Sequence, residues 1–375
     1  MKMTLEKISP YLAKSLGMPD EALAQSFAPA TREDLDELVR FRLSLFEGDA
    51  PWDDKRYLDW RYNFDGTGAE RNCMWVFRKE SKIIGCLGIE NVNLHLPGTL
   101  IPACKAMDIL VDPEFDGRGL GAWMNLYLMS IYPVIIVVGS NENSHSLLMR
   151  LFHQISHTRI FKLPVRSCQF LQKGLKSSLL SSVVSVPFDL LLSARRKLQW
   201  GRLGKDVSTR ELSVIPPYIA QLKSGREDQT CIQRSLEYLT WRYVNNPRRE
   251  FTVIGVFKGK DLVGVTICHL SLPESTQQPE ATILEWFFME DGTGINYQAL
   301  LFQGSISFLM AKGACTINVE TYCNSCHDNF HHLGFIVRDM ALPFFVYVKD
   351  NELREQLYDE DKWFLTEGDY DTDMY

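Results

Sequence analysis

The sequence of 375 residues lacks an uninterrupted apolar run that could cross a membrane. A spanning helix needs about 20 apolar residues, and the uncharged stretch 177–188 in the middle of the chain is far shorter. The first residues, Met-Lys-Met-Thr-Leu-Glu-Lys, lack the apolar core of a secretion signal. The nine cysteines are scattered without the even spacing of a disulfide framework. We therefore expect reduced thiols and a cytoplasmic protein.

An excess of positive charge is also missing. The formal net charge is −7, from 40 Lys and Arg against 47 Asp and Glu, which argues against a nucleic-acid-binding protein. One segment differs, because nine Lys or Arg lie between Lys162 and Lys205 against the single acid Asp189. Clustered cations among leucines suit a helix on an anionic membrane. Segment 171–203 is therefore expected either to contact the inner membrane face or to connect two domains as a docked helix.

Two segments of the chain are nearly the same. Residues 57–62 are Tyr-Leu-Asp-Trp-Arg-Tyr and residues 238–243 are Tyr-Leu-Thr-Trp-Arg-Tyr, a shift of 238 − 57 = 181 residues. We call these segments the Trp-Arg-Tyr boxes. Four further pairs follow in the same order with shifts from 178 to 181: 83–85 with 262–264, 143–146 with 324–327, 152–156 with 330–334, and 163–164 with 342–343. This order predicts two copies of one domain.

Each copy alternates predicted strands and helices. In the first copy, strands are predicted at 74–77, 83–92, 106–111, 134–138 and 158–163, and helices at 119–131 and 144–157. The second copy repeats this order from 251 to 348. The pattern predicts an α/β or α+β class, with a mixed central sheet flanked by helices in each copy. We expect a first domain at 1–166, a basic helical insert at 167–210, a second domain at 211–348 and an acidic tail at 349–375.

A glycine-rich loop is the sharpest chemical feature. Gly117, Gly119 and Gly121 follow a predicted strand and the sequence Val-Asp-Pro-Glu-Phe, and they open a predicted helix. Glycines let the backbone approach a ligand closely, and the first N–H groups of a helix can bind a pyrophosphate. A tight turn without ligand is the plainer interpretation. The spacing fits neither a Walker loop nor a dinucleotide-binding loop.

This segment resembles motif A of the GNAT superfamily of N-acyltransferases. There, Arg/Gln-x-x-Gly-x-Gly/Ala after Val-x-Pro holds the pyrophosphate of acetyl-CoA. Asp116 stands where the family has Arg or Gln, and Arg118 would compensate for its charge. The resemblance implies an acyl-CoA site made of Leu110, Val111, Asp116, Gly117, Arg118, Gly119, Leu120, Gly121, Ala122 and Asn143. For Asn143, capping of its helix is the alternative.

The second copy has a weaker form of this loop. Its stretch 288–297 lacks the proline and places Glu290 and Asp291 where phosphates would lie. Because negative charge opposes an anion, we expect acyl-CoA in the first copy and a degenerate partner domain in the second. The paired boxes and the ending near Trp363 are similar to GNAT-like proteins of bacterial polysaccharide gene clusters.

Acyl transfer to an amine needs a group that takes the proton of the amine and a group that protonates the leaving thiolate. The resemblance implies a carboxylate on the central strands, so Asp108 or Glu90 is expected to be the base. A salt bridge of Asp108 with Lys105 or Arg118 is the alternative.

The tyrosine that often protonates the thiolate in the family falls on Phe152, with Phe330 in the second copy. His145, His153 and His157 are candidates to replace it, because imidazole titrates near neutral pH. The alternatives are that each is an ordinary surface histidine and that no residue replaces the tyrosine.

Two other groups of residues have competing interpretations. Cys323-x-x-Cys326-His327 with His331 and His332 has zinc-ligand chemistry, but helix packing explains the run, so no metal is expected. The Trp-Arg-Tyr boxes either line an acceptor cleft or form the domain core.

The sequence as a whole predicts direct acyl transfer, without an acyl-enzyme, from acetyl-CoA or another acyl-CoA to a small-molecule amine. An amino sugar of a surface polysaccharide is the favoured acceptor. The alternatives are a non-catalytic binding or assembly protein with the same fold, and a transferase that uses an acyl carrier protein or aminoacyl-tRNA as donor.

Overall fold

The structure is a computed structural model of the chain. It describes residues 3–45, 54–64, 72–167, 178–200, 206–222, 228–274, 277–290, 292, 295–323, 326–338 and 342–370. Within the helix 178–200, side chains are described for 184–196 and for Trp200.

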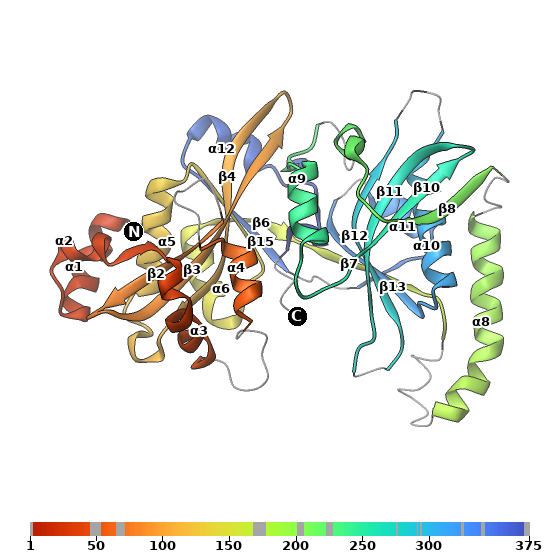
Figure 1. Ribbon diagram of the computed structural model, residues 1–375. Coiled ribbons are helices and arrows are strands. Elements are labelled where there is room, and N and C mark those ends of the chain that lie inside the picture. Colours follow the sequence, from red (N-terminus) through yellow and green to blue (C-terminus); the bar gives the residue numbers. More distant parts are fainter. Residues whose placement is uncertain are drawn as a thin grey trace.

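Two mixed sheets form the framework (Figure 1). The strands of the first sheet, in spatial order, are β1 (Phe27–Pro29), β2 (Cys73–Lys79), β3 (Lys82–Leu96), β4 (Thr99–Val111), β5 (Val134–Val138), β15 (Pro343–Val348) and β6 (His153–His157), with β9 (Cys231–Ile232) paired to β3. Strand β5 consists only of Val and Ile and lies inside the sheet, as its uninterrupted apolar run predicts.

The second sheet has the same general plan. In spatial order its strands are β14 (Ile336–Arg338), β7 (Arg159–Pro164), β13 (Thr316–Tyr322), β12 (Glu280–Phe288), β11 (Asp261–Ser271), β10 (Thr252–Lys258) and β8 (Val207–Leu212), with β16 (Leu365–Thr366) paired to β13. In each sheet one parallel pair, β4 with β5 or β12 with β13, lies among antiparallel strands. The predicted mixed α/β class is therefore confirmed.

The two halves exchange one strand. Strand β7 follows β6 in the sequence but pairs with β13 and β14 in the second sheet. Strand β15, from the second half, lies between β5 and β6 in the first sheet. A boundary at residue 166 therefore groups β7 with the first domain although its hydrogen-bonding partners lie in the second sheet. A second domain at 211–348 likewise includes β15, although the partners of β15 lie in the first sheet.

Helices cover both faces of each sheet. The helices of the first half are α1 (Leu5–Leu16), α2 (Asp20–Gln25), α3 (Leu35–Leu43), α4 (Lys55–Tyr62), α5 (Leu120–Ile131) and α6 (Glu142–Leu151). Helices α1, α2, α5 and α6 contribute to one apolar cluster, whereas α3 and α4 contribute to a separate cluster. The two groups therefore lie on opposite faces of the first sheet.

The later helices are α8 (Ser178–Trp200), α9 (Leu236–Leu239), α10 (Tyr297–Ala311), α11 (His327–His332) and α12 (Asn351–Leu357), and the π-helical turn η5 (Thr240–Val244) continues α9. Helix α12 follows β15 and packs against it, so it belongs to the first sheet. A third apolar cluster joins the halves, because it combines β3, β5, β9 and β15 with β13, β16 and the tail residue Tyr370.

The predicted helix 144–157 is too long. Helix α6 ends at Leu151, and His153–His157 form β6 instead because they pair with β15. Helix α8 lies at the outer edge of the second half (Figure 1). Among the described residues, its polar contacts are with the end of β7 and the residues that follow it, with Gln303 of α10 and with Leu333 after α11, so docking on both domains is not observed. None of the helices that the structure describes is both long and apolar enough to cross a membrane.

Candidate functional site

The central strands β4 and β5 separate along their length. They pair only at Cys104 with Ile135 and at Lys105 with Ile136. From residue 106 to residue 111, β4 has no ladder partner on the side of β5, whereas β5 pairs with β15 over its whole length. The result is a split in the first sheet that opens towards the end of β4, where Leu110 and Val111 lie.

The glycine-rich loop lies at the open end of this split. Gly119 adopts φ 89°, a left-handed conformation that favours glycine, and precedes the first residue of α5. The amides of Gly119, Leu120, Gly121 and Ala122 donate to no backbone carbonyl within the described residues. Four adjacent open N–H groups at the positive end of a helix form an anion-binding arrangement.

The charged residues of the loop point in different directions. The Asp116 carboxylate accepts the N–H of Gly117 at 2.8 Å, so its charge is engaged within the loop. Arg118 is exposed, donates to the carbonyl of Ser15 at 3.4 Å and lies over the ring of Phe115. Asn143 is exposed in the first turn of α6. The cap of that helix is Asn141, which accepts the N–H of Ser144, so the capping alternative for Asn143 is wrong.

Asp108 lies at an irregularity of β4 beside the split. The register of β3 against β4 shifts between Cys86 and Gly88, and Asp108 has φ 51°. Such a bulge leaves one residue outside the ladder and redirects its side chain. Tyr62 donates to Asp108 Oδ2 at 2.5 Å, and Arg42 donates to the same oxygen from two nitrogens at 3.2 Å.

These partners differ from those expected. Arg42, and neither Lys105 nor Arg118, forms the salt bridge with Asp108. Burial disfavours the charge of Arg42, but Asp108, Cys86 and Tyr62 together outweigh this effect and raise the pKa of Arg42. All three donors converge on Oδ2. One carboxylate oxygen of Asp108, Oδ1, is therefore without a hydrogen-bonding partner in the part of the chain that the structure describes.

Glu90 lies in a closed ionic cluster. It is 1% exposed, and its carboxylate lies 3.1 Å from Lys105, 3.3 Å from Arg61 and 3.6 Å from Arg242. Burial alone would raise the pKa of Glu90, but these three cations together lower it to about 2. Tyr238 also donates to the carboxylate at 3.1 Å. A buried carboxylate surrounded in this way suits an ionic link between the halves better than a base.

The Trp-Arg-Tyr boxes meet where the two halves join. The rings of Trp60 and Trp241 stack with centroids 5.0 Å apart. Arg61 and Arg242 both bind Glu90 in the interior, so they do not present their guanidinium groups to an open phosphate site. The boxes thus combine both interpretations, because both arginines and three of the tyrosines are buried, whereas the two tryptophans and Tyr238 border a pocket.

The pocket beside the tryptophans has a volume of about 900 Å³. Both halves line it, through α4, β3 and β4 on one side and β9 and α9 on the other. Its side chains include five amides, four aromatic rings and two acids: Asn63, Asn72, Asn91, Asn93 and Gln233; Trp60, Tyr132, Tyr238 and Trp241; Asp59 and Glu237. Asn93 and Gln233 bond across the junction at 3.2 Å. This lining can bind a neutral ligand that has many hydroxyl groups.

The corresponding split in the second copy is occupied by the chain itself. Strands β12 and β13 pair from Glu280 to Ile283 and then separate. The tail strand β16 pairs with β13 at Thr321 and Tyr322. Thr366 donates to Glu285, and Glu285 also accepts from Tyr243 at 3.2 Å, as Asp108 accepts from Tyr62.

Gly368 lies so close to Tyr243 and Glu285 that a Cβ atom there would clash with both. The second copy therefore has no open split for a ligand among the described residues. Asp291, one of the two acids used to argue degeneracy from the sequence, lies outside the described residues.

The histidines expected to replace the tyrosine acid do not share one site. His145 lies in α6, with Nδ1 2.9 Å from the hydroxyl of Ser140 and its ring edge-on to Phe345. His153 stacks on Tyr358, and His157 lies 3.3 Å from Gln154, both on β6. Phe152 is buried in the first apolar cluster. Of these three histidines, His145 lies nearest in sequence to the glycine loop, and its role as the acid stays a prediction.

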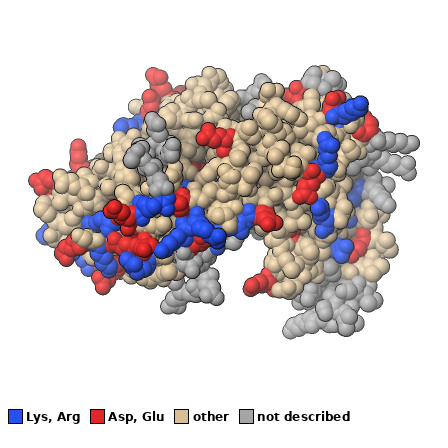
Figure 2. Space-filling view, viewed as in Figure 1, with Lys and Arg blue, Asp and Glu red and all other residues tan. Residues whose placement is uncertain are grey.

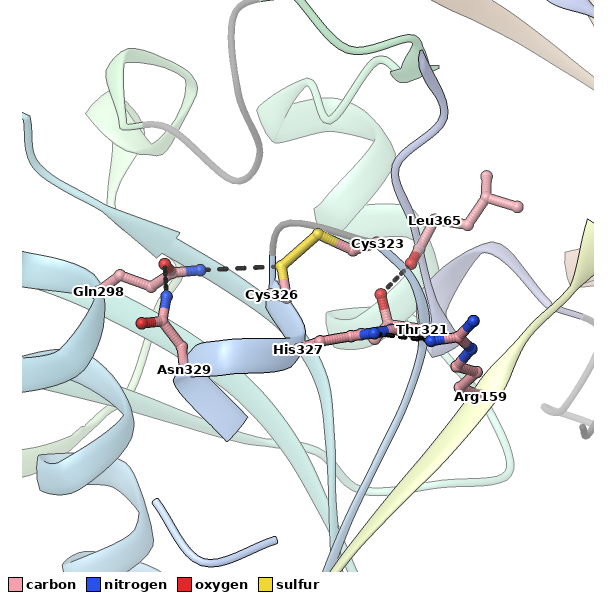
Figure 3. Close-up of a disulfide and its surroundings, with 8 residues drawn as sticks. All are labelled: Arg159, Gln298, Thr321, Cys323, Cys326, His327, Asn329 and Leu365. Atoms are coloured by element: carbon pink, nitrogen blue, oxygen red, sulfur yellow. Dashed lines mark hydrogen bonds between the residues drawn. A yellow bond between two sulfur atoms is a disulfide. The ribbon is translucent and has the colours of Figure 1, made fainter. Parts of the chain in front are cut away.

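The two cysteines of the cysteine and histidine group in the second copy are buried in an apolar cluster, which agrees with the packing interpretation (Figure 3). Cys323 and Cys326 form a disulfide at the start of α11, so the prediction of reduced thiols does not hold for this pair. His327 contacts the guanidinium of Arg159, and Gln298 approaches the Cys326 sulfur at 3.9 Å. Within the described parts of the chain, no cluster of three His, Cys, Asp or Glu could hold a metal ion.

Several contributors to the site were missed in the sequence. Arg42 and Tyr62 hold Asp108, Tyr238 holds Glu90, and the tail fills the second split. The repeat offered one signal, because Tyr62 and Tyr243 are equivalent in the two boxes and each bonds a carboxylate of a central strand. The remaining pairings join segments far apart in the sequence and carry no local pattern.

Comparison with known proteins addresses the fold. No family model matches the sequence, and no curated protein matches it. A GCN5-related N-acetyltransferase from Anabaena variabilis ATCC 29413 matches with a TM-score of 0.57 and 12% identity, over 86% of this chain and 72% of that one. A probable N-acyltransferase of unknown function from Enterococcus faecalis V583 matches with a TM-score of 0.57 and 10% identity, over 86% and 71%.

A third match is N-myristoyltransferase from Saccharomyces cerevisiae with bound myristoyl-CoA. Its TM-score is 0.50 and its identity 9%, over 86% of this chain and 78% of that one. At such identities the matches establish the fold alone. The chain has two sheets of the GCN5-related N-acetyltransferase type in tandem, which confirms the resemblance predicted from the glycine loop and the repeat.

Proposed function

We propose that this chain is an acyl-CoA-dependent N-acyltransferase that transfers an acyl group, in the first instance acetyl, directly to an amine. The observation that carries the proposal is the split between β4 and β5 with the open amides of Gly119–Ala122 at its mouth. A split sheet takes a narrow acyl and pantetheine arm, and open amides take a pyrophosphate. The structural neighbours include an N-acetyltransferase and a protein with bound myristoyl-CoA, which supports this class of donor.

The reaction needs one proton removed and one delivered. The amine nitrogen attacks the thioester carbonyl carbon, the C–S bond breaks, the nitrogen loses a proton and the thiolate gains one. Asp108 is the proposed base, because it lies at the bulge beside the split and has Oδ1 without a hydrogen-bonding partner among the described residues. Tyr62 and Arg42 hold its other oxygen and so fix its orientation.

The acceptor is proposed to enter through the pocket between the halves. Asp108 bonds Tyr62 and Arg42, so its carboxylate faces α3 and α4, and α4 also lines the pocket. Amides and aromatic rings are the side chains that bind sugar hydroxyls and sugar faces. An amino sugar is therefore the proposed acceptor, and Glu237 at the pocket would attract its cationic amine, whereas Asp59 is already paired with Arg32 at 2.6 Å. The proposed acceptor would be acylated in the cytoplasm, as part of the synthesis of a surface polysaccharide.

One rival function has its own support. Phe152 cannot donate a proton and is 7% exposed in the core, so the family's usual acid is missing. A protein that binds a ligand in the fold without catalysis would tolerate this loss. Donors other than acyl-CoA, such as an acyl carrier protein or aminoacyl-tRNA, are a further alternative. Figure 2 shows basic and acidic side chains mixed on the viewed face, with no broad basic surface for a nucleic acid.

Calorimetry tests the donor and an assay tests the chemistry. We expect acetyl-CoA and free CoA to bind with one site per chain, since the first split is open and the second is filled by the tail in the part of the chain that the structure describes. Thiol release in the presence of amino sugars should then exceed release without an acceptor. Binding without acceptor-dependent thiol release would favour the non-catalytic rival. Absence of CoA binding would contradict the donor.

A further inference from the structure

We propose that the outward face of α8 contacts the surface of an anionic lipid bilayer. This face is made of Val184, Phe188, Leu190, Leu191 and Arg195. The proposal is independent of the acyltransferase chemistry, because α8 contacts neither the glycine loop nor Asp108 among the described residues.

The inward face of α8 is fixed by specific contacts. Asp189 accepts the N–H of Ser167 at 2.5 Å, and the Ser167 hydroxyl donates to the carbonyl of Ser185 at 3.2 Å. Near the end of the helix, Trp200 donates to the carbonyl of Leu333 at 3.0 Å. Residues 185, 189, 196 and 200 are spaced by 4, 7 and 4 positions, so they share one side of a helix with 3.6 residues per turn.

Arg196 belongs to this inward side. It is only 8% exposed, and its guanidinium donates to the carbonyls of Pro164 and Val165 at 3.1 and 3.4 Å. These contacts hold α8 against the end of β7 in the second sheet. The opposite side of the helix must therefore face away from the protein, as its position at the edge of the second half in Figure 1 also indicates.

The outward face is apolar although it is exposed. Leu190 and Leu191 are 66% and 67% exposed, and Phe188 is 49% exposed. Single exposed apolar residues are ordinary, but several on one turn and a half of one helix form a patch that usually marks a contact surface. The helix cannot cross a bilayer, so an orientation along its surface is the arrangement that this length and pattern allow.

Charge selects an anionic bilayer as the occupant. The only acid of the segment, Asp189, is turned inward to Ser167, so it does not oppose a negative surface. Arg195 is exposed on the outward side, and the sequence places Lys173 and Lys176 before the helix and Lys197, Arg202 and Lys205 at or after its end. Apolar residues between clusters of cations are typical of helices that bind anionic lipid. A second copy of this chain would bring the same cations together and be repelled.

The test is sedimentation of the full chain with vesicles. Vesicles of phosphatidylcholine with phosphatidylglycerol should carry the protein down at low ionic strength, and high ionic strength should release most of it because salt screens surface charges. Vesicles of phosphatidylcholine alone should carry down much less. Failure to sediment with anionic vesicles at low ionic strength overturns the proposal, and so does equal binding to both kinds of vesicle.

Substitutions test whether vesicle binding depends on the outward face of α8 and not on exposed apolar residues elsewhere. The double change Leu190→Glu and Leu191→Glu should lower the vesicle partition coefficient at least about tenfold, and Arg195→Glu should lower it about fivefold or more. Leu272→Glu is the matched control, because Leu272 is 57% exposed on another part of the second half. It should bind vesicles like the unchanged protein. Arg196 is left unchanged, since its removal would undo the docking of α8.

Two further measurements show whether a loss of vesicle binding comes from the outward face or from unfolding. Thermal unfolding and the affinity for CoA should be the same in all variants, because none of these side chains contacts the core or the split. An equal loss of vesicle binding in Leu272→Glu would overturn the assignment of the face. Sedimentation velocity that finds a dimer, made monomeric by the double change, would show that a second copy covers the face and would also overturn it.

Discussion

Trp60 and Trp241 are related by a reciprocal pair of hydrogen bonds across the junction of the two halves. The indole N–H of Trp60 donates to the carbonyl of Trp241 at 3.0 Å, and the indole N–H of Trp241 donates to the carbonyl of Trp60 at 3.1 Å. The rings stack with planes only 20° apart. Such reciprocity is what a local two-fold axis produces, since each residue makes to its partner the contact that it receives.

This relationship places the two boxes at the axis of the molecule. The repeat therefore does more than duplicate a domain, because the duplicated residues contact each other. The two halves differ in whether the split in their sheet is open. The first split is open beside Asp108, and the second is filled by the tail beside Glu285. One copy thus has room for a ligand, and the other has become a partner that completes the pocket wall.

Substitution of Gly119 tests the donor site. Gly119→Val should abolish CoA binding in calorimetry, because a β-branched side chain disfavours φ 89° and would move the open amides. Gly292→Val is the matched control, since Gly292 also has positive φ, 71°, but lies in the second copy. We expect it to leave CoA affinity nearly intact. Equal loss in both variants would contradict a single site in the first copy.

Asp108 is expected to govern the rate rather than binding. Asp108→Asn should lower kcat by about 10²–10⁴-fold, the usual contribution of a positioned base, with CoA affinity little changed. Because Arg42 is fully buried, loss of its anion should also lower the melting temperature. Asp108→Glu keeps the charge and should recover most of the stability and part of the rate. A full rate in Asp108→Asn would assign the base to another group.

The acid that protonates the thiolate is tested at Phe152. If no residue replaces the tyrosine, kcat/KM should follow a single basic limb with pH that reports the amine or its base, whereas a histidine acid should give a bell-shaped profile. Phe152→Tyr should not lower the rate in folded protein, although a hydroxyl in this core costs stability unless it finds a partner. A bell-shaped profile whose acid limb disappears in His145→Gln, but not in His153→Gln, would identify His145 as the acid.

The sequence predicted local features well and distant pairings poorly. The apolar run of β5 was placed at 134–138 as observed, and the glycine loop opens α5 as expected. The segment 153–157 was predicted as the end of the helix 144–157, but pairing with β15, almost 200 residues away, makes it a strand. The same holds for Asp108, whose partners Arg42 and Tyr62 lie 66 and 46 residues earlier. Non-local contacts leave no periodicity in the sequence from which they could be inferred.

Glu90 is expected to hold the halves together in a pH-dependent way. Its pKa is about 2 in the folded protein against an ordinary value of 4.5, so it contributes stability above pH 4.5 that is lost as the pH falls from about 4.5 towards 2. Glu90→Gln should lower the free energy of unfolding by about 3–5 kcal/mol at neutral pH, because three buried cations lose their partner. Denaturant unfolding at pH 7 and pH 3 measures both effects. A variant as stable as the unchanged protein at pH 7 would contradict this role.

The tail strand β16 is expected to be a structural part of the second half and not a removable plug. Phe364, Leu365, Thr366 and Tyr370 are fully buried, and Arg234 binds both Glu285 and the tail residue Asp369. Gly368→Ala should lower the melting temperature because its Cβ would meet Tyr243 and Glu285. Adding Tyr243→Phe should restore part of the loss, since it removes one of the two clashing oxygens.

The CoA stoichiometry of the tail variants shows whether the tail only completes the fold or also covers a second donor site. If the tail only completes the fold, Gly368→Ala should still bind one CoA per folded chain, because the second copy lacks a glycine loop like 117–121 as well as an open split. Calorimetry on the variant, with the folded fraction set by circular dichroism, gives this number. Two CoA molecules per chain would mean that the tail covers a second donor site.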